Sequence, residues 1–123
     1  AGDSPGINGD GNYSRDFTYI DNVIQANLLS LVTTNPKAIN TVYNVAFGDR
    51  NTLNDLMGYL KENLSSFDPK IASLAVVNGP NRVGDIPHSH ASVQKAKDLL
   101  KYNPQFSLQQ GLKEAVKWYW ENL

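Results

Sequence analysis

The three arginines of this 123-residue chain each lie in a predicted loop that also contains a Gly-Asp pair. They are Arg15, Arg50 and Arg82, whereas the eight lysines fall mainly in stretches of helical periodicity. A guanidinium can hold two phosphate oxygens at once, and neighbouring glycines let a ligand approach the backbone closely. Arginine in such loops is therefore typical of a diphosphate pocket. For any single arginine, a surface ion pair or a capped carbonyl is the commoner role, and that alternative stays open.

Three nearby charged residues have structural explanations. Arg50 lies two residues before Thr52, a helix-cap candidate, so its loop needs no ligand. Asp16 can accept hydrogen bonds from its own turn, and Asp21 is a candidate N-cap. We leave these three residues out of the candidate site.

Other catalytic patterns are weak. His88 and His90 flank Ser89, but a zinc helix motif needs i, i+4 spacing, so we interpret them as surface histidines. Ser89 lacks the Gly-x-Ser-x-Gly context of a nucleophile elbow, which disfavours a hydrolase. The stretch 9–14 carries neither Gly-x-Gly-x-x-Gly nor a P-loop, so the chain shows no nucleotide-cofactor fingerprint.

The aromatic residues gather towards the C-terminus and allow two interpretations. They could stack on nucleic-acid bases, or they could form core and contacts with further chain, which their helical spacing beside leucines favours. The residues concerned are Tyr102, Phe106, Trp118, Tyr119 and Trp120.

Helices and short strands alternate along the sequence, which indicates an α/β fold. Asp21 is predicted to cap the first helix, and capping boxes at Thr52/Asp55 and Ser107/Gln110 begin two others. A first strand ends near Asn8. The other expected elements are a first helix from the Asp21 cap to the Asn35-Pro36 pair, helices 53–64, 93–100 and 108–119, strands 42–47 and 74–77, and a loop over 78–92. So few strands suggest part of a larger α/β protein.

The overall composition limits the classes of partner. Eleven basic and twelve acidic side chains give a net charge of −1, which argues against nucleic acid or an anionic membrane surface. Without cysteine there are no disulfides or thiolate zinc sites, which fits a cytoplasmic protein. No apolar run is long enough to span a bilayer. The start at Ala1, without methionine, suggests a chain that begins inside a longer polypeptide, and a trimmed chain is the alternative.

Five segments together resemble the C-terminal part of the extended short-chain dehydrogenase/reductase family, specifically its NAD-dependent sugar-nucleotide 4-epimerases. They are INGDG at 7–11, SRDFTYIDN at 14–22, VYNV at 42–45, RVGDIPHS at 82–89 and AKDLLKYNP at 96–104. The resemblance implies that residues 1–123 form a nucleotide-sugar-binding C-terminal domain with few short strands and about four helices. The Rossmann domain, with NAD and a catalytic Tyr-x-x-x-Lys, would lie outside this chain.

The resemblance also implies roles for individual residues. Arg15 and Arg82 would bind the diphosphate of a UDP-sugar, and Asp85 would hydrogen-bond the uridine ribose. The backbone around Ile7 and Asn8 would meet the uracil edge. The small side chain of Ser89 would leave room for an N-acetyl group, which favours UDP-N-acetylhexosamines over plain hexoses. No catalytic residue is expected in this chain.

In the implied reaction, NAD takes hydride from C4 of the sugar and returns it to the other face after the 4-keto sugar turns. This chain would anchor the UDP meanwhile, and the parent enzyme would be a homodimer through the missing part. Two alternatives remain: the same part of a nucleotide-sugar dehydratase or decarboxylase, and a non-enzymatic binding or assembly module.

Overall fold

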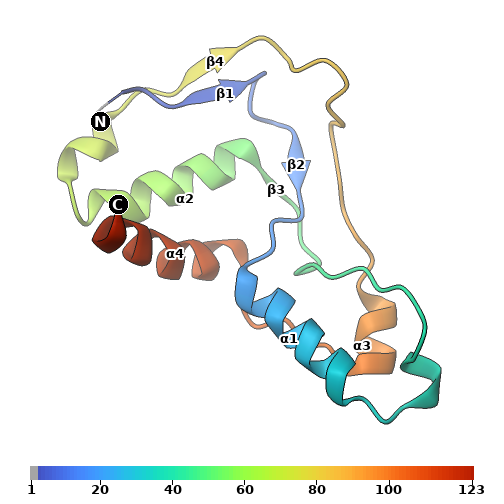
Figure 1. The fold of residues 1–123 in the computed structure, drawn as a ribbon. Helices are drawn as coiled ribbons and strands as arrows, with labels where there is room; N and C mark the ends of the chain where they lie inside the picture. Colours follow the sequence, from blue (N-terminus) through green and yellow to red (C-terminus); the bar gives the residue numbers. More distant parts are fainter. Residues whose placement is uncertain (1–2) are drawn as a thin grey trace.

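The computed structural model describes residues 3–123, so Ala1 and Gly2 of the chain start lie outside the described residues. Figure 1 shows two groups of helices, α1 beside α3 and α2 beside α4, joined by short strands and loops. The helices are α1 (Ile20–Val32), α2 (Leu53–Ser65), α3 (Gln94–Leu100) and α4 (Leu108–Asn122). The strands are β1 (Gly6–Asn8), β2 (Ser14–Arg15), β3 (Asn51–Thr52) and β4 (Val77–Gly79), with 3-10 turns at Pro36–Ala38 and Pro69–Ser73. The expected α/β class, with four helices and few strands in residues 3–123, is confirmed.

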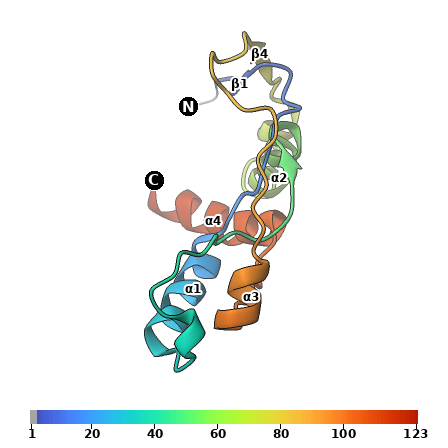
Figure 2. The ribbon, with the colours of Figure 1, turned by 90° about the vertical axis from the view of Figure 1, so that its right-hand side faces the viewer.

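The strands of the described chain pair in two small sheets. β1 runs parallel to β4 with Asn8 opposite Gly79, and β2 runs antiparallel to β3 with Ser14 opposite Thr52. Ser14 also forms an isolated parallel bridge with His88. The loop that follows β4 therefore lies beside β2, and Figure 2 shows the two segments running together between the helix groups.

Two of the three predicted helix starts are confirmed. Thr52 Oγ1 accepts from Asp55 N at 3.0 Å while Thr52 N donates to Asp55 Oδ2 at 2.8 Å, a complete capping box. Ser107 and Gln110 make the same pair of bonds at α4. The prediction for Asp21 is wrong: Tyr19 is the N-cap of α1 without a side-chain bond, and Asp21 lies in the first turn, where its charge favours the helix dipole.

The strand predicted over 42–47 is wrong, because in the described chain no neighbouring strand pairs with it. Side chains hold its backbone instead: Lys95 Nζ donates to Val42 O at 2.9 Å and the Tyr102 hydroxyl donates to Ala46 O at 2.9 Å. Exposed Val42 alternates with half-buried Tyr43 in the manner of a strand. The segment thus has the alternating burial of a strand, but a strand also needs a hydrogen-bonded partner.

Of the two remaining strand predictions, the one that ends near Asn8 is confirmed by β1, and the other is placed too early. Residues 74–77 were expected to form it, whereas β4 is Val77–Gly79 and continues into the predicted turn. Its pairing with β1 explains the shift, because Val77 N donates to Pro5 O at 2.9 Å and Gly9 N donates to Gly79 O at 3.0 Å.

The core is small and lies between α1, α3 and the segment around Ala46. Tyr102, 2% exposed, packs there with Ala26, Ala46, Val93 and Ala96. The amide of Asn22, 1% exposed, donates to Phe106 O at 2.7 Å and accepts from Gln105 N at 2.9 Å and Phe106 N at 3.1 Å. This side chain ties α1 to the segment that leads into α4.

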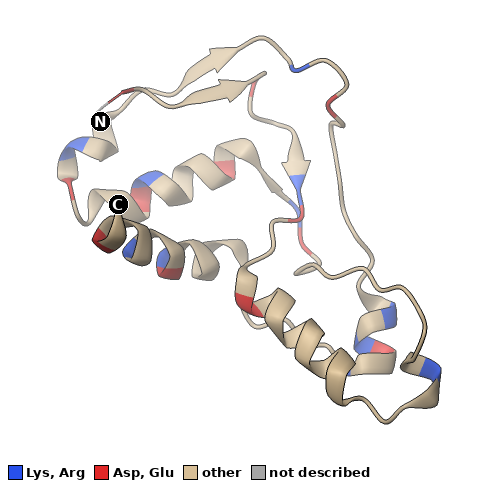
Figure 3. Ribbon diagram, viewed as in Figure 1, with Lys and Arg blue, Asp and Glu red and all other residues tan. Residues whose placement is uncertain are grey.

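Large apolar side chains remain on the surface of α1. Ile24, Leu28 and Leu31 are 45%, 56% and 81% exposed, and Figure 3 shows the helix almost free of charge. No helix within residues 3–123 is long and apolar enough to cross a membrane.

Candidate functional site

Four of the five candidate residues line one open hollow of about 400 Å³ beside β2. Arg15 comes from β2, and Arg82, Asp85 and Ser89 come from the loop after β4. Val83, Gly84 and Ile86 complete the lining. Two guanidinium groups and one carboxylate give the hollow a net positive charge, which favours an anion.

Backbone hydrogen bonds fix the register between β2 and this loop. Ser14 N donates to Pro87 O at 2.9 Å, and Ser89 N donates to Ser14 O at 3.0 Å. The side chains of the bridged residues also meet, with 2.9 Å between Ser14 Oγ and His88 Nδ1.

A tight turn at Gly84 shapes the loop. Asp85 N donates to Arg82 O at 3.2 Å, and Gly84 has φ +81°, a conformation that favours glycine. The turn brings both Arg82 and Asp85 to the edge of the hollow.

Arg15 is oriented by two acceptors. Its Nη1 donates to Ser14 O at 2.8 Å, and its Nη2 forms an ion pair with Asp85 Oδ1. Because both side chains are 29% exposed, water screens the pair and limits its contribution to stability. Its main effect is to fix the direction of the guanidinium.

Asn8 does not line this hollow. It lies exposed in β1 opposite Gly79, next to a second open hollow of about 440 Å³ formed by the turns after β1 and β4. The lining residues are Gly9, Asp10, Tyr13, Asn78, Gly79, Pro80 and Asn81. Since Asn81 and Arg82 are consecutive, the two hollows adjoin along the loop.

The second hollow has an acidic edge at Asp10. Hydrogen bonds from the Asn12 backbone amide at 2.9 Å and from its side chain at 2.8 Å lower the pKa of the Asp10 carboxyl below its usual range. This edge repels anions, so the hollow lined by Arg15 and Arg82, called the anion hollow below, is the more favourable of the two for a negative ligand.

Other charged residues have structural positions. Arg50 is exposed and lies outside the lining of the anion hollow. The prediction for Asp16 is wrong in its detail, because its carboxylate accepts from Gly48 N at 3.1 and 3.2 Å and not from its own turn. Within residues 3–123, His88 and His90 belong to no cluster of three metal-binding side chains.

Sequence reasoning did not foresee the contact between Ser14 and His88, which lies beside the anion hollow. His88 was interpreted as a surface histidine, and it is exposed, but its ring contacts a serine 74 positions away. No residue spacing signals that contact. The only hint was that each residue directly adjoins a candidate, Arg15 or Ser89.

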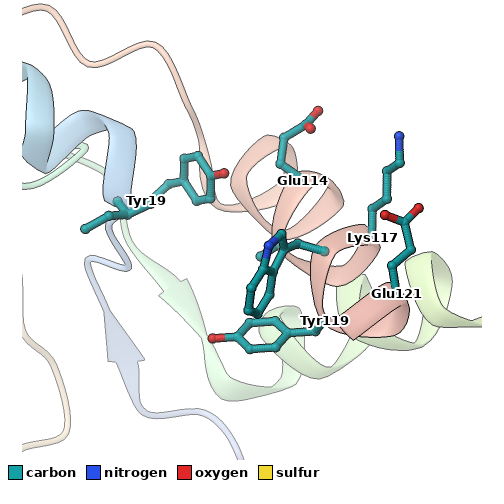
Figure 4. Close-up of a pocket in the computed structure, with 8 residues that line it drawn as sticks. Tyr19, Glu114, Lys117, Tyr119 and Glu121 are labelled. Carbon is teal, nitrogen blue, oxygen red and sulfur yellow. The ribbon is translucent and has the colours of Figure 1, made fainter. Parts of the chain in front are cut away.

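A separate hollow lies where α4 passes the start of α1, and Figure 4 shows Tyr19 extending toward α4, which carries Glu114, Lys117, Tyr119 and Glu121. Burial raises the pKa of the Tyr19 hydroxyl, and the charges of Asp21 and Glu114 add to this, so the hydroxyl stays protonated. No candidate site residue lines this hollow.

No family model matches the chain. Among curated proteins, it is 32% identical over 117 residues to a UDP-glucuronate 4-epimerase of Thermodesulfobacterium geofontis, covering 95% of this chain and 33% of that protein. A UDP-N-acetyl-alpha-D-glucosaminuronate decarboxylase of Bacillus cytotoxicus is 26% identical over 121 residues, covering 98% of this chain and 36% of that protein. The chain spans about a third of the length of the curated relatives it matches.

The solved structures that resemble this chain also include UDP-sugar 4-epimerases, and it again covers about a third of each. A UDP-glucose 4-epimerase from Thermotoga maritima, solved with UDP-glucose, has a TM-score of 0.83 and 36% identity over 98% of this chain and 36% of that chain. A UDP-N-acetylglucosamine 4-epimerase from Methanobrevibacter ruminantium, in complex with UDP-N-acetylmuramic acid, has a TM-score of 0.84 and 34% identity. The match covers 99% of this chain and 36% of that chain. A UDP-glucuronic acid 4-epimerase from Bacillus cereus, solved with UDP-glucuronic acid and NAD, has a TM-score of 0.79 and 28% identity. The match covers 96% of this chain and 36% of that chain.

Proposed function

Because this chain is the counterpart of the C-terminal part of the UDP-sugar 4-epimerases, we propose that it is the nucleotide-sugar-binding part of such an enzyme. The observation that carries the proposal is the hollow in which Arg15, Arg82, Asp85 and Ser89 meet from distant parts of the chain. In the proposal, Arg15 and Arg82 bind the diphosphate, Asp85 binds the ribose, and the backbone near Asn8 lies at the uracil end.

The adjoining hollows support this orientation. A diphosphate needs the positive hollow, and the second hollow, at the turns around Gly9 and Gly79, lies on the side where the base is proposed to bind. Held at its nucleotide end, the hexose can rotate after oxidation at C4 without leaving the enzyme. Binding energy from a remote group then serves the reacting centre.

The catalytic residues and the NAD site are proposed to lie outside this chain. The NAD found with the Bacillus cereus enzyme supports NAD as the cofactor. The parent enzyme is proposed to be a homodimer that pairs through the part outside residues 1–123, and to act in the cytoplasm.

The substrate is proposed to be a UDP-N-acetylhexosamine in preference to a plain UDP-hexose, because Ser89 is small and lines the hollow. The test is to incubate the full-length protein with UDP-N-acetylglucosamine and UDP-glucose and to measure the 4-epimers by chromatography. We expect both epimers, with the acetylated sugar converted faster. Formation of neither would contradict the proposed function.

The decarboxylase relative favours one second candidate. A decarboxylase of this kind would bind the nucleotide through the same residues but release carbon dioxide from a UDP-uronic acid. Product analysis separates the two, because an epimerase product keeps the mass of its substrate.

A further inference from the structure

We infer that Ser14 and His88 are a positioning pair, whose side-chain hydrogen bond holds the two arginines of the anion hollow at the spacing that a diphosphate needs. The inference rests on the proposed function, since it assigns these residues to the same nucleotide site. Neither residue lines the hollow, so both act through their neighbours.

The pair lies where β2 meets the loop after β4. Ser14 is 6% exposed and directly precedes Arg15, while His88 directly precedes Ser89 and follows Asp85 by three positions. The 2.9 Å bond between Ser14 Oγ and His88 Nδ1 lies between the two backbone bonds that Ser14 makes with Pro87 and Ser89. Three hydrogen bonds thus join one residue of β2 to three consecutive loop residues.

The loop has few other anchors near Arg82. Val83 is 100% exposed and Ile86 is 62% exposed, so neither side chain packs against the rest of the described chain. The Arg15–Asp85 ion pair is partly exposed and Arg82 itself is exposed. Ser14 is buried, so the serine end of its bond to His88 is shielded from water, whereas both side chains of the Arg15–Asp85 pair are 29% exposed.

Anchoring matters because a mobile loop must be ordered when a ligand binds, and that ordering costs free energy. A loop already fastened to β2 presents Arg82 and Arg15 together before the diphosphate arrives. Loss of the fastening contact should therefore weaken binding without removing any group that touches the ligand.

The position of His88 Nδ1 allows the hydrogen bond to be tested by substitution. The bond uses Nδ1 of His88, and the terminal atoms of asparagine lie at the same distance from the backbone. His88→Asn can therefore keep a polar partner for Ser14, whereas His88→Ala removes it. His90→Ala is the matched control, since it removes a neighbouring exposed histidine.

The experiment measures the dissociation constant of UDP by calorimetry on the full-length protein, together with the amide exchange rate of Ser89, whose N–H donates to Ser14. We expect His88→Ala and Ser14→Ala to raise the dissociation constant about three- to tenfold, as loss of one net hydrogen bond does. The double variant should be no weaker than either single one. His88→Asn and His90→Ala should bind like the wild type.

The outcomes separate the inference from the function on which it rests. If wild-type protein binds UDP and His88→Ala binds it equally well, or His88→Asn is as weak as His88→Ala, the positioning role is wrong and the proposed function stands. If Ser89 amide exchange is unchanged in His88→Ala, the fastening itself is refuted. If the wild type does not bind UDP, the proposed function fails, and the purpose assigned to the pair fails with it.

Discussion

The guanidinium of Arg15 forms an ion pair with the carboxylate of Asp85, a residue 70 positions further along the chain. The pair joins two groups to which the proposed function gives different ligand atoms, a phosphate oxygen and a ribose hydroxyl. Asp85 therefore has opposing effects on a nucleotide, since it weakens the positive field of Arg15 and offers the ribose an acceptor. A change at Asp85 should affect ligands with and without a ribose differently.

We expect Asp85→Asn to tighten pyrophosphate binding about threefold or more, because one negative charge leaves the hollow. UDP should gain less or lose affinity, since its ribose meets a weaker acceptor. Calorimetry of the full-length protein with both ligands measures the difference. Equal changes for the two ligands would argue against the ribose contact.

Arg82→Ala should weaken UDP binding by about 2 to 3 kcal/mol, because a charge-assisted partner of the diphosphate is removed. Arg50→Ala is the control: it deletes an arginine that also has a Gly-Asp pair nearby in the sequence but lies outside the hollow. Only the first variant should change the dissociation constant measured by calorimetry. An unchanged constant in Arg82→Ala would remove this residue from the site.

Ser89→Tyr should impair the acetylated sugar more than the plain one, because a large side chain fills the space expected for the N-acetyl group. The quantity to compare is kcat/KM for UDP-N-acetylglucosamine and for UDP-glucose. Ser92→Tyr is the control, because Ser92 is an exposed residue of the same loop and does not line the hollow. Equal losses with both sugars would count against this role of Ser89.

The start of α2 should be sensitive to acid. The hydrogen bond from the Thr52 hydroxyl, at 2.7 Å, and that from its backbone lower the pKa of the Asp55 carboxyl. A lowered pKa in the folded state means that the stabilisation is present above the ordinary carboxyl pKa and is lost as the pH falls through the lowered pKa of the folded state. Thr52→Ala should therefore cost about 1 kcal/mol near neutral pH and less in acid.

Urea denaturation of the full-length protein at several pH values measures this effect. Asp55→Asn should show the same loss near neutral pH. In the Thr52→Ala background, Asp55→Asn should change stability less than in the wild type. A stability difference that stays constant into acid would exclude Asp55 as the titrating group.

The isolated chain of residues 1–123 should show no epimerase turnover and little affinity for NAD. The site described contains groups that hold a nucleotide, while the hydride acceptor and the proton-transferring residues are proposed to lie elsewhere. Incubation of the purified chain with UDP-N-acetylglucosamine and NAD, followed by chromatography, tests this. Any 4-epimer above the level of a heat-treated sample would contradict the proposal that the catalytic groups lie outside this chain.

Local signals in the sequence predicted the helices well. Capping boxes at Thr52 and Ser107 are complete within four residues, so the sequence alone contains the interacting groups. Strands depend on distant partners, which explains why 42–47 was wrongly predicted and β4 was misplaced. Tyr19 begins α1 without any capping side chain, and no residue-type signal could reveal that.

The site was predictable to a similar extent. Loop composition indicated Arg15 and Arg82 as two anion-binding residues, and the structure brings both to one hollow. Asp85 and Ser89 were expected only from the family resemblance, and they line the same hollow. The Ser14–His88 contact was not foreseen, because serine and histidine 74 positions apart show no periodicity that links them.

Asn22 makes the joint between α1 and the approach to α4 depend on the identity of a single atom. Its amide nitrogen faces the carbonyl of Phe106, while its oxygen faces two backbone N–H groups. Deamidation would replace that nitrogen with oxygen and set a carboxylate against a carbonyl inside a nearly water-free space, where such repulsion is costly. Deamidation, with almost no change in the shape of the side chain, would thus place a negative charge at the buried joint between α1 and the approach to α4.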